Sequence, residues 1–213
     1  MNEPIRIKNT GTEEVPAFGI MRVEGIERQN NNGVAYKVRS IQLPPETPGH
    51  AIILINSAKP LETGGDARYG WARDAGMPGW VAYDDADGTP SFGAMWGVED
   101  EDFKLRMDAP GFEIFGVPDF EKKRVIARKL EKQSVYFRLS ADLDQASDML
   151  TTPDTAAAVV LIPDEANPGQ ITSSSTITLT NRWEDLSLDS GGRGYAEWNW
   201  HLLEWVVIAT ECP

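Results

Sequence analysis

The sequence predicts a mainly β protein, with an N-terminal barrel-like or sandwich-like domain followed by a small β-rich C-terminal domain. Three observations lead to this prediction. Apolar residues alternate with polar ones or form short runs, as they do in strands. The 19 Gly and 14 Pro residues in a chain of 213 residues indicate many turns. Few segments combine helix-forming residues with an absence of helix breakers.

The predicted N-terminal domain covers residues 1–132. It opens with a hairpin-like unit, because strand-like sequence at Ile5 to Ile7 and at Val15 to Val23 is separated by polar residues. Ala51 to Ile55 is apolar at every position, which predicts a strand buried on both faces. Further strands are expected where apolar and aromatic residues recur: Tyr36 to Ile41, Trp80 to Tyr83, Phe92 to Trp96, Phe103 to Leu105, Phe112 to Phe115 and Val125 to Ala127.

The predicted C-terminal domain covers residues 133–213. Its strands are expected in four segments with alternating or continuous apolar residues: Gln133 to Ser140, Ala156 to Ile162, Ser175 to Thr180 and the closing hairpin Tyr195 to Ala209. A Gly-rich turn at Ser190 to Gly194 precedes this hairpin. Only Arg128 to Gln133 and Asp142 to Leu150 have a composition that favours helical turns.

The composition limits the classes of partner. With 33 acidic and 20 basic residues the formal charge is −13, so we expect no nucleic-acid partner. The densest basic run, Lys122 to Lys129, is interleaved with apolar residues, which favours a strand with a solvated face; pairing with an acidic partner subunit is the alternative. The N-terminus lacks the apolar core of a signal peptide. The longest apolar run is far shorter than the about 18 residues of a membrane span, so no membrane partner is expected.

The residues that could carry chemistry are few. Cys212 is the only cysteine, so an intrachain disulfide and a thiolate metal cage are both excluded. The two histidines, His50 and His201, lie in no metal-binding spacing. We therefore predict no catalytic residue, no metal ligand and no cofactor.

Two acidic segments are the alternatives to this prediction, because clustered carboxylates can bind a metal ion or catalyse hydrolysis. Asp84 to Gly88 (DDADG) is partly similar to a calcium loop, but a turn whose side chains bond nearby amides is favoured. Glu99 to Asp102 (EDED) is interpreted as a solvated loop. A hydrolase would need Asp84, Asp87 or Glu99 to converge in a cleft.

The aromatic residues of the closing hairpin are the candidate contact residues. Tyr195, Trp198, Trp200 and Trp205 supply large apolar area, which suits a contact between subunits or a stacking platform for a glycan. The two interpretations differ in exposure. Rings on one open strand face favour sugar binding, and rings buried between chains favour assembly.

Four segments resemble β-rich structural proteins of tailed bacteriophages and prophage-like regions: VPAFGIMRV (Val15 to Val23), WVAYDDADGTPSFGAMWG (Trp80 to Gly97), FKLRMDAPGFEIFG (Phe103 to Gly116) and EWVVIATEC (Glu204 to Cys212). The resemblance implies a non-enzymatic virion component made in the bacterial cytoplasm. Its expected partners are itself, as a homotrimer, and the major capsid protein or other virion proteins. A capsid decoration (cement) or head-fibre protein is the first expectation, in which the N-terminal domain anchors the protein and the C-terminal domain projects or oligomerises. The alternatives are a tail or neck protein, or a module that binds a host glycan.

Overall fold

The computed structural model describes residues 4–28, 33–41, 52–92, 96–107, 109–147, 153–164, 167, 170–200 and 202–211. The chain divides into two compact units, Met1–Glu131 and Lys132–Pro213. This division lies one residue from the boundary expected from the sequence, and the anchoring and projecting roles of the units stay predictions. The mainly β fold is confirmed, since the only helical elements of the described residues are two 3₁₀ turns, η1 (Asp66–Arg68) and η2 (Asp85–Asp87). Within these residues, no helix is long and apolar enough to cross a membrane.

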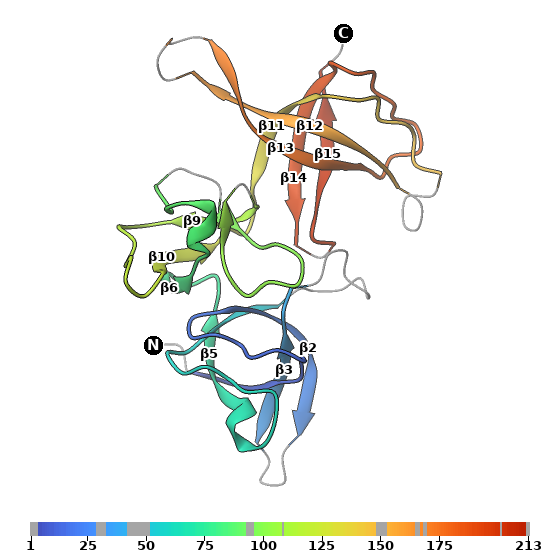
Figure 1. Ribbon diagram of the computed structural model, residues 1–213. Coiled ribbons are helices and arrows are strands. Elements are labelled where there is room, and N and C mark those ends of the chain that lie inside the picture. The colour runs from blue at the N-terminus through green and yellow to red at the C-terminus, as the bar shows by residue number, and fades with distance from the viewer. Residues whose placement is uncertain are drawn as a thin grey trace. The chain divides into compact units, whose positions relative to one another are not determined.

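Unit 1 begins with a closed five-stranded barrel, coloured blue to teal in Figure 1. Its strands are β1 (Ile5–Asn9), β2 (Ile20–Arg28), β3 (Val34–Arg39), β4 (Ile53–Asn56) and β5 (Tyr69–Asp74). They follow the order β1-β3-β2-β4-β5, in which β1 and β3 are parallel and the other neighbouring strands are antiparallel. The barrel core contains Ile7, Val15, Met21, Val38, Leu54, Leu61, Ala72 and Phe103.

The strand β4 is buried along its whole length, as predicted for this apolar segment. Leu54 belongs to the barrel core, whereas its neighbours Ile53 and Ile55 point to the opposite face of the strand. Both neighbours are nevertheless at most 2% exposed. The outer face of the barrel is therefore covered at β4, which explains why no polar residue alternates there.

The second sheet of unit 1 has the order β6-β10-β9-β7-β8 and is antiparallel throughout. Its strands are β6 (Gly79–Ala82), β7 (Trp96–Gly97), β8 (Arg106–Met107), β9 (Gly111–Ile114) and β10 (Arg124–Lys129). Backbone hydrogen bonds join it to the barrel: Ala82 N donates to Phe18 O at 3.0 Å, and Ile20 N donates to Phe103 O at 2.6 Å. Phe103 also enters the barrel core. The two sheets thus form one packed body.

Unit 2 is a second closed barrel, coloured yellow to red in Figure 1. Its strands are β11 (Ser134–Leu139), β12 (Asp154–Pro163), β13 (Ile171–Asn181), β14 (Arg193–Asn199) and β15 (Glu204–Thr210), in the order β11-β12-β13-β15-β14. The closing hairpin β14–β15 is confirmed. Glycine is needed at Gly194, near the start of β14, because a Cβ there would lie 2.2 Å from the carbonyl oxygen of Ala209 in β15.

The two predicted helical turns are wrong in the described residues. Arg128 and Lys129 extend β10 and pair with Glu113 and Phe112 of β9. Residues 142–147 form no helix, and Leu143 exchanges two backbone hydrogen bonds with Leu188, both 2.9 Å long. Helix propensity contributes only about 0.7 kcal/mol per residue or less, and strand pairing outweighs it. Residues 148–150 lie outside the described residues, as do Ala51 and residues 93–95 of the expected strands.

Candidate functional site

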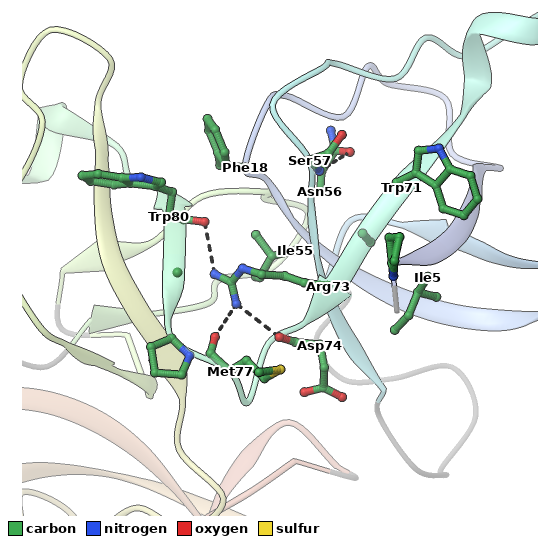
Figure 2. A pocket seen from close by; sticks show the side chains of 14 residues that line it. Ile5, Phe18, Ile55, Asn56, Ser57, Trp71, Arg73, Asp74, Met77 and Trp80 are labelled. Carbon is green, nitrogen blue, oxygen red and sulfur yellow. Dashed lines mark hydrogen bonds between the residues drawn. The ribbon is translucent and has the colours of Figure 1, made fainter. Parts of the chain in front are cut away.

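The candidate site is a pocket of about 960 Å³ in unit 1, lying beside β5 and β6 where the barrel meets the second sheet (Figure 2). Most of its lining is apolar or aromatic. The lining residues are Pro4, Ile5, Phe18, Ile55, Asn56, Ser57, Trp71, Ala72, Arg73, Asp74, Met77, Pro78, Gly79 and Trp80. Such a lining, with few polar groups, is typical of ligand and side-chain binding sites.

Arg73 lies at the centre of the pocket in Figure 2 and holds the turn between β5 and β6. Its Nη1 donates to the carbonyl oxygens of Asp74, at 3.1 Å, and Met77, and its Nη2 donates to that of Trp80 at 3.1 Å. Burial lowers the pKa of the Arg73 guanidinium. Glycine is needed at Gly79, because a Cβ there would lie 2.7 Å from Arg73 Nε. The charge in the pocket is therefore used to fix the turn.

Two tryptophans form the sides of the pocket, and Figure 2 shows them on opposite sides of Arg73. Trp71 is 51% exposed, whereas Trp80 is half-buried. The guanidinium of Arg124 lies 4.5 Å from the ring centroid of Trp80 and 5.0 Å from that of Phe18. Cation–π contacts of this kind hold both rings in place. The aromatic wall at Trp80 is therefore preformed.

The amide of Asn56 is also engaged by the chain itself. Its Nδ2 donates to the carbonyl oxygens of Pro16 and Lys59 at 2.8 and 2.9 Å, and its Oδ1 accepts from Ser57 N at 2.8 Å. Because the amide and the guanidinium are used internally, the exposed chemistry of the pocket is mainly apolar. It suits an aromatic or aliphatic group more than a strongly polar one.

The acidic residues considered for a hydrolytic site surround the guanidinium of Arg106. Arg106 Nη1 lies 3.1 Å from Asp84 Oδ2 and 3.4 Å from Asp87 Oδ2, and its Nε lies 2.6 Å from Asp102 Oδ2 and 4.0 Å from Glu99 Oε2. The four carboxylates thus surround one guanidinium. We call this group the Arg106 cluster.

The predicted turn at Asp84 is confirmed in its hydrogen bonding. Asp84 Oδ1 accepts from Ala86 N at 2.9 Å at the start of η2. This hydrogen bond, followed by the charges of Arg106 and Lys104, lowers the pKa of Asp84. The interpretation of 99–102 as a solvated loop is wrong for Asp102, whose side chain is only 18% exposed. Asp102 accepts hydrogen bonds from the backbone amides of Phe103 and Lys104, so it orders the loop.

Among the described residues, no three His, Cys, Asp or Glu side chains are grouped so that they could hold a metal ion. His50, His201 and Cys212 lie outside the described residues.

The candidate contact residues of the closing hairpin have two different environments. Trp198, Trp200 and Trp205 are 3 to 6% exposed and pack edge to face, with the Trp198 ring centroid 6.0 Å from that of Trp200 and 5.6 Å from that of Trp205. Tyr195 is 49% exposed and packs against Tyr136 at 5.1 Å. A contact role for these residues stays a prediction, and Tyr195 is the member whose ring has area available.

The pocket itself was not singled out from the sequence, where Trp71 and Trp80 were two of seven tryptophans. A usable signal is the alternation in β5. Ala72 lies in the barrel core, so Trp71 and Arg73 must point outward. An outward tryptophan beside an outward arginine marks this face of the barrel.

Comparisons with protein-family models, with curated proteins and with solved structures found no match to this chain.

Proposed function

We propose that this chain is a non-enzymatic structural component of a tailed-bacteriophage virion, and specifically a capsid decoration (cement) or head-fibre protein. In this role it binds copies of itself, as a homotrimer, and the major capsid protein or another virion protein. It is made in the bacterial cytoplasm and its final location is the virion. A tail or neck protein is the nearest alternative.

The observation that carries the proposal is that unit 1 has two groups of exposed apolar side chains. Val117 and Phe120, between β9 and β10, are 81% and 62% exposed, and Trp71 and Met77, at the pocket, are 51% and 42% exposed. Singly exposed apolar residues are common, whereas grouped ones mark contact sites. The charge of −13 keeps such a subunit soluble before it assembles.

The Arg106 cluster supports the non-enzymatic part of the proposal. A general acid or base must exchange a proton with a substrate. Asp84, Asp87 and Asp102 instead form ion pairs with the guanidinium of Arg106 at 2.6 to 3.4 Å. Their geometry fits a role in holding the loops of the second sheet.

The proposal is tested by mass spectrometry of purified particles of the phage or prophage that encodes the chain. Intact virions are separated from free heads and free tails on a density gradient, and peptides of the chain are quantified in each fraction. We expect them in virions and heads. Their presence only with tails would favour the tail or neck alternative, and their absence from all particles would end the proposal.

A glycan-binding module for host recognition is the second candidate function, and the exposure of Trp71 favours it. A half-exposed indole at the edge of an apolar pocket is a stacking surface for a pyranose ring. This function predicts that the purified chain binds host polysaccharide on a glycan array and that Trp71→Ala abolishes the binding. Trp183→Ala is the matched control, since Trp183 is 46% exposed but lies in unit 2.

A further inference from the structure

We infer that the tip of the β9–β10 hairpin of one copy, residues 115–123, inserts Val117 and Phe120 into the pocket between Trp71 and Trp80 of a second copy. The inference rests on the proposed function, because it assigns a contact within the homo-oligomer. The two surfaces that meet, the hairpin tip and the pocket, both belong to unit 1.

The hairpin tip is ordered by its own hydrogen bonds. Asp119 and Arg124 exchange two backbone hydrogen bonds of 2.8 and 3.2 Å. The carboxylate of Asp119 accepts from Lys122 N at 3.1 Å and from Arg124 Nε at 3.0 Å. Because the turn is already fixed, docking it costs little conformational entropy. Val117 and Phe120 are nevertheless 81% and 62% exposed. Exposing two large apolar side chains to water is unfavourable, and such exposure marks contact sites.

The pocket is complementary to this tip. Its walls are aromatic and aliphatic, and the guanidinium of Arg124 holds the Trp80 ring from one face at 4.5 Å. An indole on each side suits the edge of a phenyl ring such as that of Phe120. None of residues 115–123 lines the pocket of its own chain. The tip is therefore available to a neighbour.

The charges favour a second copy as the occupant. The chain carries −13 overall, so two copies repel one another unless a basic element meets an acidic one. The hairpin tip presents the exposed cation Lys122, and the pocket rim carries the exposed carboxylate of Asp74. Opposite charges at the edge of an apolar contact set its orientation and speed its formation. The tip itself carries no net charge, because Asp119 and Glu121 balance Lys122 and Lys123, so it can approach the acidic surface of a second copy without net repulsion.

The contact also allows three copies to form a closed ring. The tip and the pocket are different surfaces, so each copy gives its tip to one neighbour and receives a tip from the other. Such a heterologous contact can close into a three-membered ring, whereas a contact between identical surfaces can only make pairs. Stable contacts bury about 1,200 Å² or more in total, so the tip and pocket form the apolar centre of a wider contact.

The contact is tested by cross-linking two single-cysteine variants, both made in a Cys212→Ser background. Glu121→Cys places a thiol beside Phe120, and Met77→Cys places one at the pocket, so both apolar anchors of the tip stay intact. The two variants are mixed and treated with a short bismaleimide. We expect a product of twice the 23.5 kDa chain mass, formed much faster than with Glu121→Cys and Trp183→Cys. Equal rates in the two mixtures would overturn the inference.

A second measurement uses light scattering on variants that introduce a negative charge at exposed apolar residues. Phe120→Asp is expected to reduce the mass of the oligomer to that of one chain. Its control, Ile171→Asp, changes a residue that is 55% exposed in unit 2 and is expected to keep the oligomer. An unchanged mass in Phe120→Asp would refute the contact. The chain could then still be found in virions, so this failure is distinct from a failure of the proposed function.

The same samples report whether a glycan occupies the pocket instead. If Phe120→Asp keeps its oligomeric mass while Trp71→Ala loses binding to host polysaccharide, the pocket is a glycan site and the inference is wrong. If Phe120→Asp and Trp71→Ala both yield single chains, the tip and the pocket act as one contact.

Discussion

Arg73 shows how one side chain shapes the candidate site. It donates to three backbone carbonyls across the β5–β6 turn and needs the space left by Gly79. The outward direction of Trp71 and Arg73 is predictable from the two-residue period of a strand. Their pocket is not, because it depends on the turn that brings β6 alongside and on hydrogen bonds that leave no trace in residue spacing.

We predict that Arg73→Met lowers the free energy of unfolding by about 2 kcal/mol, because hydrogen bonds from a charged donor are lost. The control Arg6→Met changes an exposed arginine whose guanidinium lies 5.7 Å from the Tyr69 ring, and should cost about 0.5 kcal/mol or less. Urea unfolding followed by tryptophan fluorescence measures both. A cost for Arg73→Met no greater than for the control would show that the turn does not depend on this side chain.

Gly79→Ala should act through the same contact. A Cβ at this position would press on Arg73 Nε, whereas a Cβ at Gly25 would meet nothing within 4 Å. We therefore expect Gly79→Ala to be destabilising and to be non-additive with Arg73→Met, by about 0.5 kcal/mol or more in a double-mutant cycle. Gly25→Ala should combine additively with Arg73→Met. Additive behaviour of both glycine variants would separate Gly79 from Arg73.

At the scale of elements, alternation and turns predicted most strands, including the buried β4 and the hairpin β14–β15. The order of the strands in the sheets could not be predicted from the sequence, because the parallel pairing of β1 with β3 joins segments far apart in the chain. The loops around Arg106 were also missed in part. The sequence predicts a local turn at Asp84 to Gly88 and a solvated loop at Glu99 to Asp102. Only the fold brings carboxylates of both segments to one guanidinium.

The Arg106 cluster makes the second sheet sensitive to acid. The folded-state pKa of Asp84 is lowered, first by the amide of Ala86 and then by Arg106. Its contribution to stability is thus present above the unfolded-state pKa of about 3.9 and is lost as the pH falls through the lower folded-state value. We predict that Asp84→Asn is destabilising at pH 7 and that its difference from wild type shrinks towards pH 3. Thr89→Ala, in the same loop, should not show this trend, and a constant difference for Asp84→Asn in urea unfolding would contradict the prediction.

At the scale of the whole molecule, the chain consists of two units that each hold a core. The division at Glu131 and Lys132 follows from contacts, whereas the sequence offered only a change of pattern near this point. Unit 2 forms its own closed barrel and contains three tryptophans that pack against one another. Trp198 lies in β14, Trp205 in β15 and Trp200 in the connection between these strands. Their burial within one chain could not be read from the sequence, because a buried core ring and an interface ring have the same composition.

A fragment of residues 132–213 should therefore fold by itself. We predict cooperative thermal unfolding and a strong near-ultraviolet circular dichroism signal from the packed indoles. Trp205→Ala should destabilise the fragment by about 3 to 5 kcal/mol, the usual cost of deleting a buried aromatic side chain. Tyr195→Ala, at a half-exposed ring, should cost much less. A fragment that unfolds without cooperativity would show that unit 2 depends on unit 1.

Both the proposed function and the inferred hairpin contact predict a homotrimer. The most direct test is the solution mass of the wild-type chain, measured by multi-angle light scattering. We predict a mass three times that of the 23.5 kDa chain, maintained on dilution through the micromolar range. The mass of a single chain at every concentration would contradict a self-assembling virion subunit and would favour the glycan-binding module.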